Sequence, residues 1–152
     1  MANELERICK LLDGGDAELQ IAVARVLREL KPKDATVRKA LSGALKSEND
    51  MVRMYALEAL AAIDLETALP ILVPLLGGSE AIRARASQLL VEAGAKAAKA
   101  LRDHLDSKDP QVRKGVLDLL GKIPGVDTAD ALFAGLLAPD VEVVKRAAQA
   151  YR

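Results

Sequence analysis

The stretch "DPQVRKGVLDLL", Asp109–Leu120, has two related stretches upstream in the chain. These are "NDMVRMYALEAL", Asn49–Leu60, and "SEAIRARASQLL", Ser79–Leu90. Each begins with a residue that caps helices well, followed by two variable residues, a β-branched aliphatic residue and an arginine. Small and large apolar residues then follow in the same order. A pattern that returns about every 30 residues indicates a repeat protein.

The repeats align on an aliphatic anchor three residues after each candidate N-cap. The anchors are 33, 30, 30 and 31 residues apart. The N-caps are Asp16, Asn49, Ser79, Asp109 and Asp140, and the anchors are Leu19, Val52, Ile82, Val112 and Val143. In the last repeat Val144 would also serve as the anchor. Apolar residues follow four, eight and eleven positions after the anchors, within about 80° of one another on a helix, which predicts amphipathic helices.

A second series of apolar stripes lies between these helices and begins with Leu5, Ile8 and Leu12. Turn-forming stretches such as "DGGD", "SEND" and "DSKDP" separate the two series. We therefore expect five helical hairpins in a single domain over residues 1–152, at about 3–31, 34–63, 65–93, 95–123 and 127–152. One hairpin cannot bury both of its stripes, whereas stacked hairpins bury them in one continuous core. The chain stops at "AAQAYR" without an evident capping helix, which is compatible with a fragment of a longer protein.

The stretches "DPQVRKGVLDLL", "NDMVRMYALEAL" and "TALPILVPLL" resemble HEAT repeats, most closely the short type found in the phycobilisome-lyase group of HEAT-like proteins. The resemblance is strongest over about residues 50–137 and weakens at Leu19-Gln20 and Val143-Val144, where the aliphatic-arginine pair is missing. We expect an all-α fold, a right-handed α-solenoid (superhelix) of about five HEAT-like helical hairpins. The resemblance implies that the second helix of each hairpin lines the concave surface. It also makes a bend at Pro74, inside a first helix, a matter of shape rather than of function.

The composition argues against several functions. Lys plus Arg and Asp plus Glu both number 22, and aromatic residues make up only 2% of the chain, so nucleic-acid binding is disfavoured. The N-terminus lacks the features of a secretory signal, and no apolar run is long enough to cross a membrane. These features predict a cytoplasmic protein without membrane association. The single cysteine, Cys9, is expected to be a buried small hydrophobe, with a reactive thiol as the alternative.

No constellation for catalysis, metal binding or cofactor binding is visible. His104 is the only histidine, and we interpret it as a boundary residue. Metal-dependent hydroxylases of the HEAT-like kind carry paired His-Glu motifs, and this chain has none. The sequence therefore favours a non-catalytic scaffold that binds a protein partner and holds no cofactor. A bilin lyase or isomerase-type subunit is the first alternative, by resemblance only, and a nucleic-acid-binding HEAT-like protein is the second. The sequence does not indicate the oligomeric state.

The recurring arginines Arg53, Arg83 and Arg113 have two interpretations. They could form a ladder of contacts to anions or nucleic acid. The favoured interpretation pairs each of them with an acidic residue of a neighbouring turn, such as Asp50, Glu80 or Asp109.

Helix geometry predicts which part of each second helix faces away from the core, namely the positions two, five, six and nine after the anchor. On the central three second helices we expect a partner to bind across Met54, Leu57, Glu58, Gln88, Lys114, Leu117 and Asp118. Apolar residues framed by polar ones favour a protein-binding surface there. The alternative is that some of these apolar residues pack against the adjacent repeat.

Overall fold

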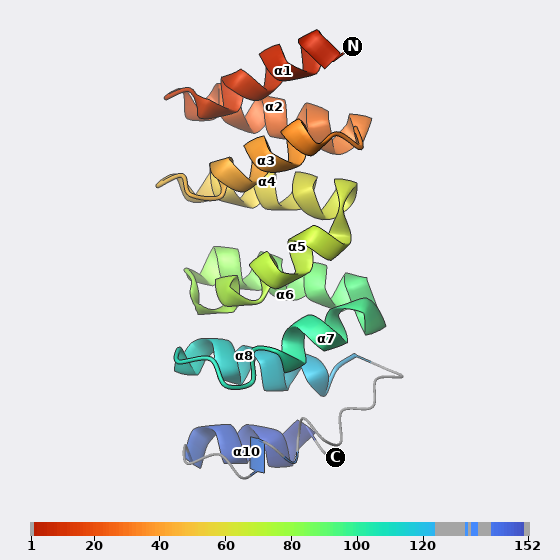
Figure 1. Cartoon of the computed structure of the whole chain (residues 1–152). Coiled ribbons are helices and arrows are strands. Elements are labelled where there is room, and N and C mark those ends of the chain that lie inside the picture. The colour runs from red at the N-terminus through yellow and green to blue at the C-terminus, as the bar shows by residue number, and fades with distance from the viewer. Residues whose placement is uncertain (1, 124–132, 134, 137–140, 151–152) are drawn as a thin grey trace. The chain divides into compact units, whose positions relative to one another are not determined.

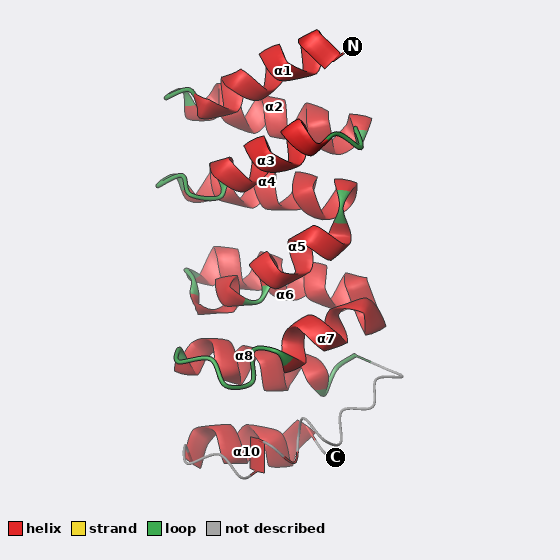
Figure 2. Ribbon diagram, in the orientation of Figure 1, coloured by secondary structure: helices red, strands yellow, loops and turns green. Residues whose placement is uncertain are grey.

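The computed structural model describes residues 2–123, 133, 135–136 and 141–150. Every regular element within those ranges is a helix, and none is a strand (Figure 2). The chain forms two compact units, Met1–Ala68 and Leu69–Arg152, and the boundary between them falls within one helix.

Unit 1 contains two helical hairpins (Figure 1). Its elements are α1 (Ala2–Lys10), the 3-10 helix η1 (Leu11–Asp13), α2 (Ala17–Leu30), α3 (Ala35–Ala44), α4 (Asp50–Ile63) and the start of α5 (Leu65–Leu72). The second helices α2 and α4 pack against each other, and the first helix α3 packs against both α1 and α4. First helices therefore lie beside first helices and second helices beside second helices, as a stack of hairpins requires.

Unit 2 continues the alternation of short first helices and longer second helices. It contains the rest of α5, η2 (Pro74–Gly77), α6 (Glu80–Ala93), η3 (Gly94–Lys96), α7 (Ala97–Arg102), α8 (Pro110–Leu120) and α10 (Val141–Ala150). Helix α8 packs against η2 and α6 of the hairpin before it and against α10 after it. The first helix of the fifth predicted hairpin lies largely outside the described residues. The fold class is an all-α solenoid, as the periodicity predicts.

The predicted N-caps are confirmed at three positions. Asp16, Asn49 and Asp109 each accept hydrogen bonds from backbone N–H groups of the first helical turn, at 2.8–3.3 Å. Ser79 occupies the predicted N-cap position of α6, but its side chain makes no capping hydrogen bond. Its backbone φ of −57° differs from the −80 to −87° of the other three caps. Asp140 lies outside the described residues.

The core consists of the predicted stripes. The leucines eight positions after the anchors are fully buried or nearly so, and they are Leu27, Leu60, Leu90 and Leu120. Burying a leucine side chain stabilises a fold by about 1.5–3 kcal/mol. In α10 the buried residue is Ala147, which lies four positions after Val143, whereas Ala148 is exposed. The burial therefore supports Val143 as the anchor of the last repeat.

Pro74 breaks its helix instead of bending it. Helix α5 ends at Leu72, and Pro74 is the first residue of the 3-10 helix η2. Proline at this position lacks only an N–H that has no partner within the helix, so the break leaves no donor unsatisfied. Pro70, by contrast, lies inside α5.

Candidate functional site

The recurring arginines hold the turns that connect the two helices of a hairpin. In the second hairpin Arg53 donates from Nη1 to the carbonyl oxygen of Ser47, at 2.7 Å, and also pairs with Asp50. The Ser47 hydroxyl in turn accepts from the backbone N–H of Asn49 at 3.2 Å. The arginine therefore closes the loop that presents the N-cap of its own helix.

The fourth hairpin repeats this arrangement 60 residues later. Arg113 donates from Nη1 to the carbonyl oxygens of Ser107, at 2.6 Å, and of Lys108, at 3.2 Å. The Ser107 hydroxyl accepts from the N–H of Asp109 at 3.3 Å. The predicted structural role is supported at both sites. The predicted acidic partner is found for Arg53, and Arg113 contacts two backbone carbonyl oxygens.

The interpretation is wrong for Arg83. Its side chain is half-buried and makes no hydrogen bond or ion pair with any residue that the structure describes. The reason lies in the preceding turn, where Gly77 occupies the position of Ser47 and Ser107. Gly77 has no hydroxyl to accept from the N–H of the N-cap residue, and it ends the 3-10 helix η2, so the third turn does not repeat the hydrogen bonding of the other two.

Arg113→Ala is expected to lower the free energy of unfolding by about 1–3 kcal/mol, because two backbone carbonyls lose a charged donor. Arg83→Ala is the matched control and should change it by about 0.5 kcal/mol or less. Urea denaturation followed by circular dichroism measures both. Equal losses for the two variants would contradict the assignment.

Two ion pairs tie elements of unit 1 together. Arg28 of α2 donates to Glu58 of α4 at 2.7 Å and to Glu29 at 3.0 Å. The hydrogen bonds to Glu29 and Glu58 raise the pKa of Arg28 above its ordinary value. Glu58 was predicted to contact a partner, but its side chain is buried and its carboxylate is paired with Arg28.

The other ion pair joins Arg38 of α3 to Asp64, with 3.5 Å between Nε of Arg38 and Oδ2 of Asp64. Asp64 accepts hydrogen bonds from the backbone N–H and hydroxyl of Thr67, at 3.1 and 2.9 Å. These bonds, and to a lesser degree Arg38, hold the pKa of the Asp64 carboxyl below its ordinary value. The stability that Asp64 contributes is present above the ordinary aspartate pKa and is lost as the pH falls through the lowered one.

The predicted outward direction is wrong for Leu57 and Leu117. Their exposed fractions are 1% and 0%, and Ala24 at the same repeat position is buried too. Helix α8, for example, packs against the hairpin before it and against α10 after it, so its buried arc covers about 160° of the helix rather than the 80° of the stripe alone. The position five residues after the anchor falls inside that arc. The alternative, packing against the adjacent repeat, applies to Leu117, which contacts Ala147 of the following repeat.

The remaining predicted residues differ in accessibility. Gln88 is exposed and its amide donates to Glu92 at 2.9 Å, while Met54, Lys114 and Asp118 are half-buried. The prediction missed Met51, which is 46% exposed at the position before the anchor. Its helical angle, about 100° behind the anchor, would have placed it outside the stripe.

We use the term outward strip for the accessible residues on the side of the second helices opposite the buried arc. In unit 1 the strip comprises Ala22, Arg25, Glu29, Met51 and Met54, and in unit 2 it comprises Ala84, Gln88, Val91, Lys114 and Asp118. Met51 and Val91 are the most exposed large apolar residues of their strips, at 46% and 44%. Each unit thus offers apolar side chains framed by polar and charged groups.

Cys9 is buried, as predicted, and is among the residues that line a cavity of about 430 Å³ between α1 and α3. Burial raises the pKa of its thiol, and the carboxylates of Asp34, Asp13 and Glu6 raise it further. The thiol therefore stays protonated at neutral pH, which argues against the alternative of a reactive cysteine. The cavity is also lined by Lys10 and Lys39.

Other candidate chemistry is sparse in the described part of the chain. His104 is half-buried, and its Nδ1 lies 2.8 Å from the carbonyl oxygen of Ala100, a structural contact within the helix turn. The described residues contain no group of three or more His, Cys, Asp or Glu that could hold a metal ion. Among them, no helix has both the length and the apolar character needed to cross a bilayer.

Comparisons with solved structures show similar helical repeat proteins. An engineered protein solved by the Northeast Structural Genomics Consortium is 27% identical over 97% of this chain and 77% of its own, with a TM-score of 0.53. A chain from the complex of CpcE and CpcF of phycocyanin lyase from Nostoc sp. PCC7120 is 26% identical over 95% of this chain, with a TM-score of 0.57. This chain spans 62% of that protein's length.

A comparison with curated proteins found no match. The family model of HEAT repeats matches residues 5–86 and 75–152, which together include nearly the whole chain. The matched ranges contain the hairpins, the recurring turns and the outward strips described above. The chain therefore belongs to the HEAT-repeat family.

Proposed function

We propose that the protein is a non-catalytic scaffold that binds a protein partner through its outward strips. The observation that carries this proposal is the exposure of Met51 and Val91 among polar neighbours on rigid second helices. Large apolar side chains in such settings often dominate binding energy, whereas the polar rim sets orientation. Membership of the HEAT-repeat family supports a role in protein interaction.

The packing behind each strip suits a binding surface. Helix α4, which carries Met51, is held against α2 by buried side chains and by the Arg28–Glu58 pair. In unit 2, α6 carries Val91 and has Leu89 and Leu90 buried behind it. A partner would therefore meet side chains whose backbone is already ordered, which lowers the entropic cost of association.

The revised surface retains most of the predicted residues. Met54, Gln88, Lys114 and Asp118 are at least partly accessible, whereas Leu57 and Leu117 are buried. Variants such as Leu57→Asp and Leu117→Asp would therefore report on folding rather than on binding.

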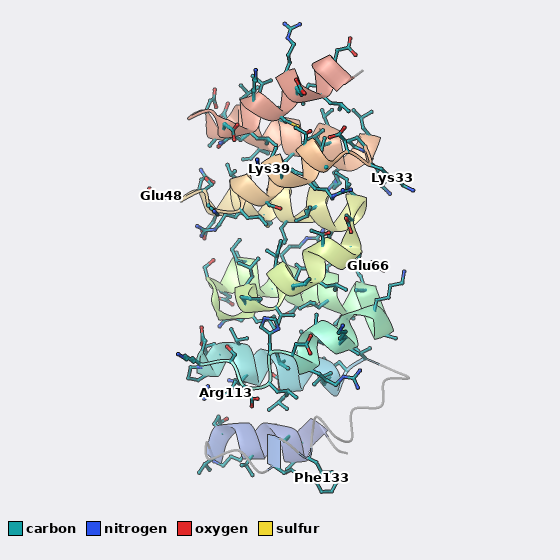
Figure 3. The ribbon with its side chains drawn as sticks, viewed as in Figure 1. Lys33, Lys39, Glu48, Glu66, Arg113 and Phe133 are labelled. Atoms are coloured by element: carbon teal, nitrogen blue, oxygen red, sulfur yellow. The ribbon has the colours of Figure 1, made fainter. Side chains whose placement is uncertain are left out.

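Photo-crosslinking tests this proposal in cells. A p-benzoylphenylalanine side chain at Met51 or at Val91 is expected to capture one defined protein. The same probe should not capture it from the first helices, at the exposed Lys39 of α3 (Figure 3) or at the exposed Lys99 of α7. Val91→Asp should then weaken binding of the purified partner by about 2 kcal/mol, roughly thirtyfold in Kd. Equal capture from the first helices, or unchanged affinity, would refute the proposal.

A subunit of a lyase acting on bilins is a second candidate. It is favoured by the similarity to the chain from the phycocyanin lyase complex, over 95% of this sequence. Incubation of the protein with a bilin tests it directly. A shift in the absorbance of the bilin would favour this candidate, and an unchanged spectrum would exclude bilin binding by this chain alone.

A further inference from the structure

Helix α2 exposes apolar residues that its counterparts bury. Val26, seven positions after its anchor, is 48% exposed, and the anchor Leu19 is 41% exposed. In α4, α6 and α8 the residues at these two positions are only 0–9% exposed. At Val26's position they are Ala59, Leu89 and Leu119, and at the anchor they are Val52, Ile82 and Val112. Leu30 at the end of α2 is also exposed. One flank of α2 is thus apolar and uncovered.

In the fourth repeat the corresponding flank, on α8, is covered by the hairpin that comes before. In unit 2, a Cβ atom added to Gly115 of α8 would lie 3.2 Å from Leu76 of η2, and one added to Gly77 would lie 3.1 Å from the anchor Val112. The flank with the anchor therefore packs against the preceding hairpin. On α2 this flank is one half of a repeat–repeat interface.

The other half is found at α10. Leu117 of α8, five positions after its anchor, packs against Ala147 of the following repeat. The equivalent residue of α10 is Ala148, which is exposed. Phe133 and Val141 are also exposed, at 57% and 68%. A Cβ atom added to Gly135 would lie 2.9 Å from Ala147, so the segment that carries Phe133 packs against α10, and the Phe133 ring points away from α8 in the view of Figure 3. Both halves of the interface are thus apolar and accessible in one chain.

The flank of α2 also has the shape for an inserted side chain. A groove of about 550 Å³ lies where the flank meets the outward strip, and its apolar lining is Val26 and Leu30 of the flank and Ala22 of the strip. Arg25, Arg28 and Glu29 form its polar rim. An aromatic ring contributes a large apolar area with few rotatable bonds, so Phe133 is suited to fill such a groove.

We infer that a second copy of this chain binds the α2 flank through the surface around α10 and Phe133. The contact reuses the packing between successive repeats inside the chain, with the preceding hairpin supplied by another molecule. Because the two surfaces differ, the contact is heterologous, and each added copy leaves one surface of each kind free. The association is therefore head-to-tail, and a dimer can add further copies.

Sedimentation velocity and light scattering of the 152-residue chain measure this association. The average mass should rise with concentration from the 16.2 kDa monomer past that of a dimer. Val26→Glu and Phe133→Glu should each leave only monomers, because each blocks one surface. Met51→Glu is the matched control, since Met51 is 46% exposed but lies off the α2 flank, and it should associate like the parent chain.

Mixing the two blocked variants gives the decisive result. The Val26→Glu copy keeps its α10 surface and the Phe133→Glu copy keeps its α2 flank, so the mixture should form a one-to-one dimer and nothing larger. A parent chain that remains monomeric up to millimolar concentration would overturn the inference. A dimer formed by either variant alone would also overturn it, because a symmetric contact would then explain the association. Circular dichroism confirms that each variant is folded.

Discussion

Leu117→Ala is expected to lower the free energy of unfolding by about 2–5 kcal/mol, the range for truncating a fully buried leucine. Leu117 is 0% exposed and packs with Ala147, Leu105 and Leu136. Its loss leaves a cavity between successive repeats, which neighbours held in helices can fill only partly. Urea denaturation followed by far-ultraviolet circular dichroism measures the change.

Leu11→Ala provides the control for that experiment. Leu11 is 42% exposed in η1, so its truncation should cost about 1 kcal/mol or less. Equal losses for Leu117→Ala and Leu11→Ala would contradict the assignment of Leu117 to the core. A selective loss would confirm that the position five residues after the anchor stabilises the contact between repeats.

The periodicity of the sequence was sufficient to predict the fold class and the core. Residues such as Leu60 and Leu90 recur at helical spacing, and an apolar stripe that recurs in successive hairpins can be buried only by stacking them. Three of the five N-caps were predictable for a similar reason, because capping depends on a local side chain and the adjacent N–H groups. These features are encoded within one helix or one hairpin.

The outward face was harder to predict because its extent depends on neighbouring helices. A stripe calculated for one helix gives the centre of the buried arc but not its width. Leu57 and Leu117 lie at the edge of that arc, where the flanking helix decides whether a residue is buried. The contacts of the recurring arginines were also hard to predict. The Arg53 side chain bonds the preceding turn and the Arg83 side chain does not, although both arginines follow an aliphatic anchor. The two turns differ in sequence, with Ser47 before Arg53 and Gly77 before Arg83.

Gly77 shows how a departure from the repeat pattern reflects contact with the next repeat. It stands where the second and fourth hairpins have serine. A Cβ atom at Gly77 would overlap the Asp109 carboxylate and would lie 3.1 Å from Cγ2 of Val112. The same carboxylate caps α8 by accepting from the N–H of Gln111 at 2.8 Å. The missing side chain thus makes room for the N-cap of the following second helix.

Gly77→Ala is therefore expected to lower the free energy of unfolding by about 1–3 kcal/mol, the usual cost of overpacking a tight contact. Gly43→Ala is the control, because a Cβ at Gly43 in α3 meets nothing within 4 Å, and it should raise stability by about 0.5–1 kcal/mol. The loss from Gly77→Ala should shrink in an Asp109→Ser background, where a smaller capping side chain leaves more room. Denaturation of the single and double variants measures this coupling. If Gly77→Ala cost the same in both backgrounds, the Asp109 carboxylate would not be what requires glycine at this position.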